Sequence, residues 1–500
     1  MSEELLDLNE VMKIRRAKLL KLREANIEPF AYAYSRTNMT EEIRSDYAGY
    51  EGKTVSLAGR LMSLRPMGKV TFCDLMDASG RIQLYVGQKQ IGEQAYEVFK
   101  LFDIGDIVGI KGQVFKTHAG EITVSAAEIT LLTKNLRPLP IVKQAEKDGE
   151  KIVYDAFADT EQRYRQRYID LNVNPQVREV FIKRSRVISA MREYLDARGY
   201  LEVETPILQP IYGGAAARPF TTHHNALDIT LYMRIADELY LKRLIAGGFE
   251  GVYEISKDFR NEGIDRTHNP EFTMMELYVA YQDYTFMMNL VEEMVCTISE
   301  KLNGTLQLTY QGEKIDLTPP WRRLPMFEAL QQYSGINLYG KEREELAAAA
   351  KQLHIPVEKS WSAGKIIDEI FKEKVEPNLI QPTFICDYPV ELSPLAKRHR
   401  SDSRLVERFE PFVVGREIGN AFTELNDPID QRERFETQRA AFEAGDEEAH
   451  QLDDDFIRAL EVGMPPTAGL GMGVDRLVML LTDSASIRDV IFFPTMRPEQ

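Results

Sequence analysis

The feature that most constrains the fold is a pair of strand-like segments, 251–260 and 270–281, joined by a short polar loop. The segments read "GVYEISKDFR" and "PEFTMMELYVAY", and other strand-like segments of this region also follow one another through short loops. The helical segments are kept apart from them along the chain. This order predicts an α+β domain rather than a doubly wound α/β sheet.

The second of these segments has a regular alternation of side chains. Because successive strand residues point to opposite faces, Phe272, Met274, Glu276 and Tyr278 should share a face of their strand, and Arg260 and Glu262 should share a face of theirs. If the two strands form a hairpin, one surface carries a guanidinium, carboxylates and an aromatic ring. An arginine can clamp phosphate oxygens through its planar fork, and an aromatic ring can stack on a base. Such a surface therefore suits a nucleotide, the alternative being a hairpin laced with surface salt bridges.

A second polar segment, "FVVGREIGNAFTELND" at 412–427, supplies further carboxylates. Glu410 and Glu417 have the chemistry to hold a divalent cation on phosphates, because magnesium prefers a few carboxylates plus substrate oxygens. Asn420, Phe422 and Glu424 alternate on one face, so that Glu424 could reach a cationic ligand. Taken alone, these carboxylates could equally be solvated surface charges.

The segment "GLGMGVDR" at 469–476 has glycines at alternate strand positions. This spacing is typical of a place where a ligand or another backbone approaches closely. The segment is not G-x-G-x-x-G and does not open a βαβ unit, so it is not interpreted as a dinucleotide-binding loop.

The N-terminal part of the chain has a different pattern. Five short strand-like segments fall within 54–135, with a helical interval near 91–102, which fits a small closed barrel of the OB type. Residues 136–140, "LRPLP", form a proline-rich connection at the end of this region. The basic stretch 12–23 is predicted to be a helix, either a solvated face or an RNA contact.

Helices and a predicted insertion dominate the C-terminal part. A helix at 178–198 should stop at Gly199 and be followed by an extended segment, 201–208. Another is expected at 236–248, with Asp237 as its cap, and 322–377 is mostly helical. The predicted division is a helical extension (1–50), an OB domain (51–140), a linker (141–174) and a catalytic domain (175–500).

Charge and cysteine content exclude several classes. A net charge of −16 argues against a protein that coats nucleic acid by bulk electrostatics. No stretch approaches the ~20 apolar residues of a membrane span, and residues 1–11 are acidic without the apolar core of a signal peptide. Three scattered cysteines exclude a disulfide framework and disfavour a zinc site, so a cytoplasmic protein is expected.

Together these segments resemble a known family. The region 178–208, "FRNEGIDRTHNPEFTMMELY" and "GLGMGVDRLVMLL" are similar, in order, to the three signature motifs of class II aminoacyl-tRNA synthetases. The segments "GGAAARPF", "RIADELYLKRL", "REIGNAFTELND" and "SIRDVIFFP" narrow the resemblance to lysyl-tRNA synthetases of the bacterial type. It implies a catalytic domain on an antiparallel sheet behind an N-terminal OB-fold barrel.

The resemblance also implies substrates and residue roles. The substrates would be ATP, L-lysine and tRNA(Lys), with Mg2+ as cofactor and a homodimer as the assembly. Arg260 would grip the α-phosphate, Phe272 and Arg476 would sandwich the adenine near Glu262, and His268 and Asn269 would face the phosphates and ribose. The metal ligands would be Glu410 and Glu417, and the lysine-binding residues would be Gly214, Glu238, Glu276, Tyr278, Asn420, Phe422 and Glu424.

The barrel has its own expected site. By resemblance, Phe72, Gln83 and Glu121 would bind the anticodon, the ring by stacking and the polar groups by reading base edges. Alternation alone does not say which face of a strand is inside, so Phe72 as a core residue stays the alternative.

Two departures from the family pattern and three rivals accompany this interpretation. The order Arg266-Thr267-His268 differs from the usual loop, which leaves open the residue that reaches the γ-phosphate, and Asp237 stands where proline is frequent. An aspartyl- or asparaginyl-tRNA synthetase would need a cation where Glu276 and Glu424 stand. An RNA-binding or regulatory protein whose synthetase-like domain has lost its activity would not need Arg260, Glu410, Glu417 and Arg476. A synthetase-like ligase that modifies protein would not need an OB domain.

Overall fold

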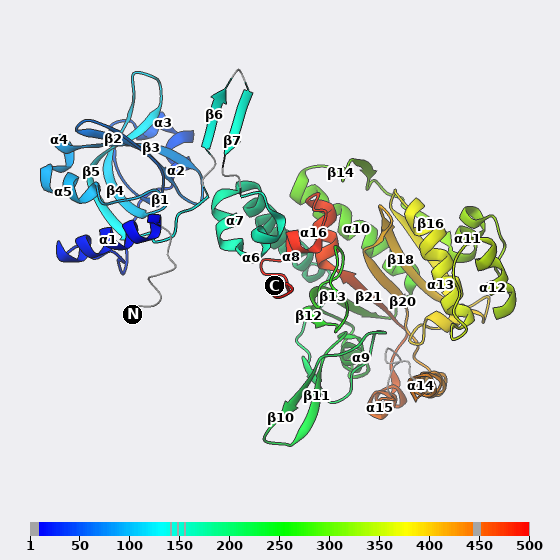
Figure 1. The fold of residues 1–500 in the computed structure, drawn as a ribbon. Coiled ribbons are helices and arrows are strands. Elements are labelled where there is room, and N and C mark those ends of the chain that lie inside the picture. The colour runs from blue at the N-terminus through cyan, green and yellow to red at the C-terminus, as the bar shows by residue number, and fades with distance from the viewer. Residues whose placement is uncertain (1–9, 141–142, 148–149, 155–156, 444–451, 500) are drawn as a thin grey trace. The chain divides into compact units, whose positions relative to one another are not determined.

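The computed structural model describes residues 10–140, 143–147, 150–154, 157–443 and 452–499. They form two compact units, one of the residues up to 163 together with 168–173, the other of 164–167 and the residues from 174 onward (Figure 1). The expectation for the extreme N-terminus concerns residues 1–9, which lie outside the described residues.

The first unit is built on a closed five-stranded barrel, which confirms the predicted OB fold. Its strand order is β1-β2-β3-β5-β4, with β3 and β5 parallel and the other pairs antiparallel. The interior is filled by alternate residues such as Cys73 and Leu75, both fully buried. The strands are β1 (Thr54–Met67), β2 (Val70–Met76), β3 (Arg81–Gly87), β4 (Ile107–Lys116) and β5 (Ile122–Thr133).

Helices surround this barrel, and α5 lies in the interval where the sequence predicts helix, whereas α4 ends at the first residue of that interval. The basic stretch at 12–23 lies within a helix, as predicted, and buries Leu19 and Leu22. The unit also contains a two-stranded hairpin. The elements are α1 (Glu10–Glu24), α2 (Thr40–Ser45), α3 (Tyr47–Tyr50), α4 (Gln88–Ile91), α5 (Glu93–Phe99), β6 (Lys143–Lys147) and β7 (Glu150–Tyr154); α6 (Thr160–Arg165) and α7 (Arg167–Val173) follow.

The second unit is built on a large sheet with strand order β16-β17-β18-β20-β21-β13-β12-β8, and β19 pairs with β18. The central pairs are antiparallel, as expected, whereas the edge pairs β16–β17 and β12–β8 are parallel. The strands are β8 (Leu201–Glu202), β12 (Gly251–Phe259), β13 (Glu271–Ala280), β16 (Arg322–Pro325), β17 (Thr383–Pro389), β18 (Leu405–Val413), β19 (Arg416–Glu417), β20 (Gly419–Thr423) and β21 (Thr467–Gly473).

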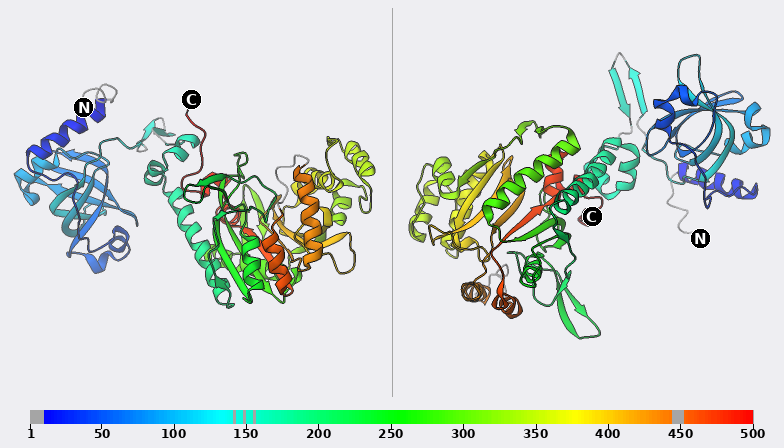
Figure 2. Two further views of the ribbon diagram at one scale, coloured as in Figure 1. Left: turned by 90° about the horizontal axis from the view of Figure 1, so that it is seen from below. Right: turned by 180° about the vertical axis from the view of Figure 1, so that it is seen from behind.

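Helices cover both faces of this sheet (Figure 2). On one face, α8 (Pro175–Asp196), α10 (Tyr284–Asn303) and α16 (Val474–Leu481) enclose the largest core. On the other face, α9 (Glu238–Ala246), α14 (Pro428–Glu443) and α15 (Asp454–Gly463) contribute to one cluster, and α11 (Met326–Ser334), α12 (Arg343–Gln352) and α13 (Ala363–Lys374) to another. The remaining elements are β9 (Leu208–Gln209), β10 (Thr221–His224), β11 (Ile229–Met233), β14 (Gln307–Tyr310), β15 (Glu313–Asp316) and α17 (Ile487–Val490).

Three local expectations differ from the structure. In the segment 201–208 only β8 and the first residue of β9 belong to strands, although the N–H of Val203 also donates a hydrogen bond to the carbonyl of Tyr253 in β12. Asp237 occupies the N-cap position of α9, but its side chain caps no backbone N–H and instead accepts a hydrogen bond from Ser256. The predicted helical insertion begins with a strand, β16, because residues 322–325 extend the sheet beside β17.

The apolar face of α8 packs inside the unit. Val187, Met191 and Leu195 are fully buried against the chain's own core. These three residues are therefore not available for the contact of the expected homodimer. Exposed apolar side chains do occur nearby, at Leu201 and Leu208.

Candidate active site

A cavity of about 310 Å³ opens on the face of the sheet opposite α8 and α10. Alternation along β13 creates its floor. Phe272, Met274, Glu276 and Tyr278 line the cavity, whereas the intervening Met275, Leu277 and Val279 belong to the core on the other face. The sequence predicts this division of faces.

The neighbouring strands continue the floor. Asn420 and Phe422 of β20 line the cavity, and the three alternate glycines of β21 lie beside them. At Gly469 a Cβ atom would lie 1.9 Å from Oε1 of Glu424 and 2.6 Å from Cε1 of Tyr278. At Gly469 the close approach that the glycine spacing predicts is made by two side chains.

One end of the cavity carries positive charge. Arg260 follows β12, and its Cζ lies 5.0 Å from the ring centroid of Phe272. Its Nε donates a hydrogen bond to the carbonyl oxygen of Ile235 at 3.3 Å, which fixes the direction of the guanidinium. Glu262 also lines the cavity, and its backbone N–H bonds to the carbonyl of Arg260 at 2.9 Å. This end can bind an anion beside an aromatic surface.

The loop between β12 and β13 is held by its own polar side chains. Asp265 accepts hydrogen bonds from the backbone N–H groups of Thr267 and His268 and lies 2.8 Å from Nδ1 of His268. Asn269 is buried, donates to the carbonyl of Glu271 and accepts from the N–H of Thr495. His268 and Asn269 both line the cavity, so the loop presents an ordered edge to it.

Glu410 and Glu417 lie together on the cavity wall. Burial raises the pKa of Glu410, and the nearby Glu417 carboxylate raises it further although Arg408 opposes this. Tyr388 donates to Glu410 at 2.8 Å, and Arg476 contacts Glu417 at 3.2 Å. Two mutually repelling carboxylates on an anion-binding cavity fit Mg²⁺, which prefers a few carboxylates plus substrate oxygens. No cluster of three or more metal-ligating side chains occurs among the described residues.

The other end of the cavity carries negative charge. Glu238, the first residue of α9, and Glu276 of β13 both line it, and Tyr278 donates a hydrogen bond to Glu276 at 3.1 Å. Gly214 faces them with φ +90°, and a Cβ there would lie 3.2 Å from the Cβ of Glu238. Burial raises the pKa of Glu276 well above its usual range, and Asp237 adds to the shift. The ionised form of this carboxyl group is therefore favoured only when a cation is close.

Glu424 lies behind the wall rather than on it, and the structure reveals a partner that the sequence analysis missed. Its Oε2 contacts Nζ of Lys242, a fully buried residue of α9. Its Oε1 lies on the Gly469 side and accepts no hydrogen bond from any residue that the structure describes. Lys242 follows Glu238 by four positions, and this spacing places both residues on one helix face. The sequence could therefore have indicated the pair between Glu238 and Lys242.

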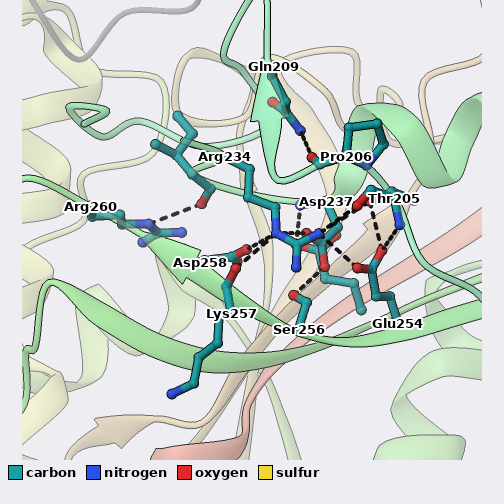
Figure 3. A network of polar contacts seen from close by, with 12 residues as sticks. Thr205, Pro206, Gln209, Arg234, Asp237, Glu254, Ser256, Lys257, Asp258 and Arg260 are labelled. Carbon is teal, nitrogen blue, oxygen red and sulfur yellow. Dashed lines mark hydrogen bonds and ion pairs between the residues drawn. The ribbon is translucent and has the colours of Figure 1, made fainter. Parts of the chain in front are cut away.

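A buried ionic network supports both ends of the cavity and was also missed (Figure 3). Arg234 lies 2.7 Å from Glu254, 3.1 Å from Asp237 and 3.5 Å from Asp258. Burial, followed by the neighbouring Asp258, raises the pKa of Asp237 to about 8. The network joins the start of α9, which carries Glu238, to the end of β12, which precedes Arg260.

The barrel places its predicted residues by the same alternation. Phe72 is partly exposed on the outer face, its ring centroid 5.4 Å from that of Tyr85, which packs in turn on Phe115. Gln83 accepts a hydrogen bond from the hydroxyl group of Thr123. Glu121 is exposed and lies two residues before Thr123 in the sequence. Phe72 is therefore not a core residue, and it belongs to an aromatic row whose other members the sequence analysis missed.

Comparison with known proteins identifies the family. The family described as tRNA synthetases class II (D, K and N) matches residues 159–497, and an OB-fold nucleic acid binding domain matches residues 55–132. Relatives named lysine–tRNA ligase include those of Moorella thermoacetica (56% identical over 98% of this chain and 99% of the relative) and Thermoanaerobacter sp. (55%; 99% and 97%). Another, from Porphyromonas gingivalis, is 54% identical over 99% of this chain and 87% of the relative. The chain therefore belongs to the lysine–tRNA ligase family of class II tRNA synthetases.

Proposed function

We propose that this chain activates L-lysine with ATP and transfers it to the 3′ end of tRNA(Lys). In the first step an oxygen of the lysine carboxylate attacks the α-phosphorus of ATP, which forms lysyl-adenylate and releases pyrophosphate. In the second, the hydroxyl of the terminal adenosine of the tRNA attacks the adenylate carbonyl, and AMP leaves. Neither step needs a protein nucleophile, so positioning and charge stabilisation supply the catalysis.

The observation that carries this proposal is the charge division of one cavity. Arg260 and Arg476 line it together with Glu238 and Glu276, so a molecule with an anionic and a cationic end has one orientation of lowest energy. Lysine that reacts through its carboxylate with ATP is such a molecule.

At the positive end, Arg260 would bind the α-phosphate, where negative charge builds up in the transition state. Phe272 and Arg476 would enclose the adenine, with Glu262 beside its amino group. His268 and Asn269 would contact the phosphates and ribose from the ordered loop. Mg²⁺ bound by Glu410 and Glu417 would neutralise phosphate charge when ATP is present.

At the negative end, Gly214 and Glu238 would hold the backbone end of lysine, and Glu276, Tyr278 and Glu424 would surround its side chain. Asn420 and Phe422 would complete the floor of this pocket. An aspartate or asparagine side chain would instead need a cation or a neutral donor here. Lys242 does not offer one, because Glu238 and Glu424 already pair with it.

The outer face of the barrel supports a role in tRNA binding. The partly exposed ring of Phe72 can stack on an unpaired base, and Gln83 and Glu121 can read its edge. A homodimer is also proposed, with the exposed apolar residues of β8 and β9 as its contact. Sedimentation at about twice the 57.3 kDa of the chain is expected, and a 57.3 kDa species at micromolar concentration would contradict the dimer.

The test is ATP–pyrophosphate exchange, measured without tRNA for each of the twenty amino acids. Lysine should support the fastest exchange, and Arg260→Ala should reduce it by about 100-fold or more, the usual cost of a lost transition-state donor. Exchange driven by aspartate or asparagine would overturn the assignment.

A further inference from the structure

Lys242 is a buried ammonium that the proposed reaction does not use. It lies on α9, has no exposed surface, and does not line the cavity. Its Nζ is 2.5 Å from Oε1 of Glu238 and contacts Oε2 of Glu424. The rings of Phe422 and Phe456 lie 5.4 and 5.9 Å from it, so aromatic faces cover the rest of the group.

The two carboxylates that Lys242 joins come from different parts of the fold. Glu238 begins α9, whereas Glu424 directly follows β20 on the far side of Gly469. Each gives one oxygen to Lys242, and Oε1 of Glu424 is left without a donor among the described residues. One ammonium therefore fixes the spacing and direction of two carboxylates that no backbone hydrogen bond joins directly.

The charge of Lys242 also sets the total charge of the proposed lysine-binding site. Glu238, Glu276 and Glu424 would together bring three negative charges to a site where burial raises the pKa of each. The positive charge of Lys242 reduces the net charge of the site to two negative charges. The substrate lysine carries two ammonium groups, so the two charges match. Arg260 stands at the other end, where the substrate carboxylate would react. Burial would lower the pKa of Lys242, but Glu238 and Glu424 outweigh burial and raise it, so the group stays charged.

We infer that Lys242 is a positioning residue for the amino-acid substrate, holding Glu238 and Glu424 as an ion-paired clamp of fixed span that accepts the two ammonium groups of lysine. This inference rests on the proposed function, because it takes Glu238 and Glu424 as the groups that receive the two ends of the substrate. A different arrangement makes the opposite prediction. If Lys242 merely occupied the position of a substrate ammonium, it would compete with lysine, and its removal would tighten lysine binding.

The variant Lys242→Met separates these possibilities because it keeps the length of the side chain and removes the charge. Loss of one partner from a buried ion pair is costly, so the KM for lysine in pyrophosphate exchange should rise at least 10-fold and up to about 100-fold. The KM for ATP should stay within about 2-fold, since Lys242 contacts none of the residues at the positive end of the cavity. A lysine KM that is unchanged or lower would overturn the inference.

Lys134→Met is the matched control. Lys134 is equally buried and pairs with two carboxylates, Asp103 at 2.6 Å and Asp106 at 2.8 Å, but it lies in the barrel unit. Its replacement should cost stability while leaving the lysine KM of pyrophosphate exchange unchanged. An equal rise of the lysine KM in this variant would show a general folding effect and overturn the role of Lys242.

A second variant is needed in case Lys242→Met does not fold. Misfolding would be recognised by the loss of ATP affinity and of the cooperative thermal transition. Lys242→Gln keeps a hydrogen-bond donor between the carboxylates without the charge, and the same selective rise of the lysine KM is expected. If this variant instead kept the native lysine KM, the charge of Lys242 would have no role and the inference would fail. Exchange driven by an amino acid other than lysine in the unaltered protein would instead contradict the proposed function.

Discussion

At the residue scale, the side chain of Glu424 carries the strongest claim about substrate choice. It is fully buried, one oxygen contacts Lys242, and the other lies behind Gly469 next to Tyr278. Removal of its charge would leave the substrate ammonium without a partner, which costs roughly 3–5 kcal/mol in a closed site. Glu424→Gln should therefore lower kcat/KM for lysine by about 10²- to 10³-fold.

The readout for Glu424→Gln is steady-state pyrophosphate exchange with lysine and ATP varied in turn. The KM for ATP should change little, because the phosphate-binding end of the cavity is untouched. A lysine kcat/KM equal to that of the unaltered protein would remove Glu424 from the binding site.

Asp237 gives a prediction about stability and pH. Its pKa is raised to about 8 by burial and then by Asp258, against an unfolded value of about 3.9. The folded state thus holds the proton more tightly, so this group's contribution to stability is greatest below about pH 4 and is lost as the pH rises through about 8. In Asp237→Asn this loss should be absent, because the amide does not ionise beside Asp258 and Glu254.

Thermal unfolding at pH 5 and pH 9 measures this effect. Asp237→Asn should gain at least about 1 kcal/mol relative to the unaltered protein on going from pH 5 to pH 9. Asp228→Asn is the control, since the side chain of Asp228 is 94% exposed and should shift nothing. A pH dependence in Asp237→Asn that matches the unaltered protein would mean that Asp237 is ionised in the folded state throughout.

At the element scale, β21 shows how a strand can shape a site through what it lacks. A Cβ at Gly469 would collide with Glu424 and Tyr278, whereas a Cβ at Gly473 would meet nothing closer than 3.6 Å. Gly469→Ala should therefore displace Glu424 and raise the lysine KM about 10-fold or more, a cost of over ~1.4 kcal/mol. Gly473→Ala should leave the lysine KM nearly unchanged, and similar effects of the two substitutions would contradict this use of the strand.

The outer face of the barrel makes a prediction at the same scale. Phe72→Ala should reduce kcat/KM for tRNA charging about 10-fold, because a stacked base contributes roughly 1–3 kcal/mol. Pyrophosphate exchange, which needs no tRNA, should persist. Tyr32→Ala is the control, since Tyr32 is 99% exposed on the same unit. Parallel loss of charging and exchange in Phe72→Ala, with a lower melting temperature, would make Phe72 a structural residue.

Elements were the level that the sequence predicted best, and the reason is periodicity. The alternation of β13 assigns Phe272 and Glu276 to one face whatever covers the other face, and the five barrel strands have the same property. The buried ion pairs of Lys242 and Arg234 could not be predicted, because only tertiary packing decides whether a charged helix or loop residue is buried. Asp237 occupies the N-cap position without capping, because its carboxyl group pairs with Arg234, three residues earlier, and accepts a hydrogen bond from Ser256 of β12, a contact that only tertiary packing creates.

At the scale of the whole molecule, the two units would have separate tasks. The barrel would bind the anticodon, and the sheet unit would activate lysine and transfer it. No helix among the described residues is long and apolar enough to cross a membrane. The activated lysine should therefore end on tRNA rather than on protein or water.

Charging of purified tRNA(Lys) tests this transfer. The protein is incubated with ATP, radiolabelled lysine and tRNA(Lys), and the acid-precipitable lysine ester and the AMP released are both counted. One lysine ester should form for each AMP released, and no ester should form when aspartate or asparagine replaces lysine. Release of AMP without a lysine ester on tRNA(Lys), or an ester formed with aspartate or asparagine, would contradict this prediction.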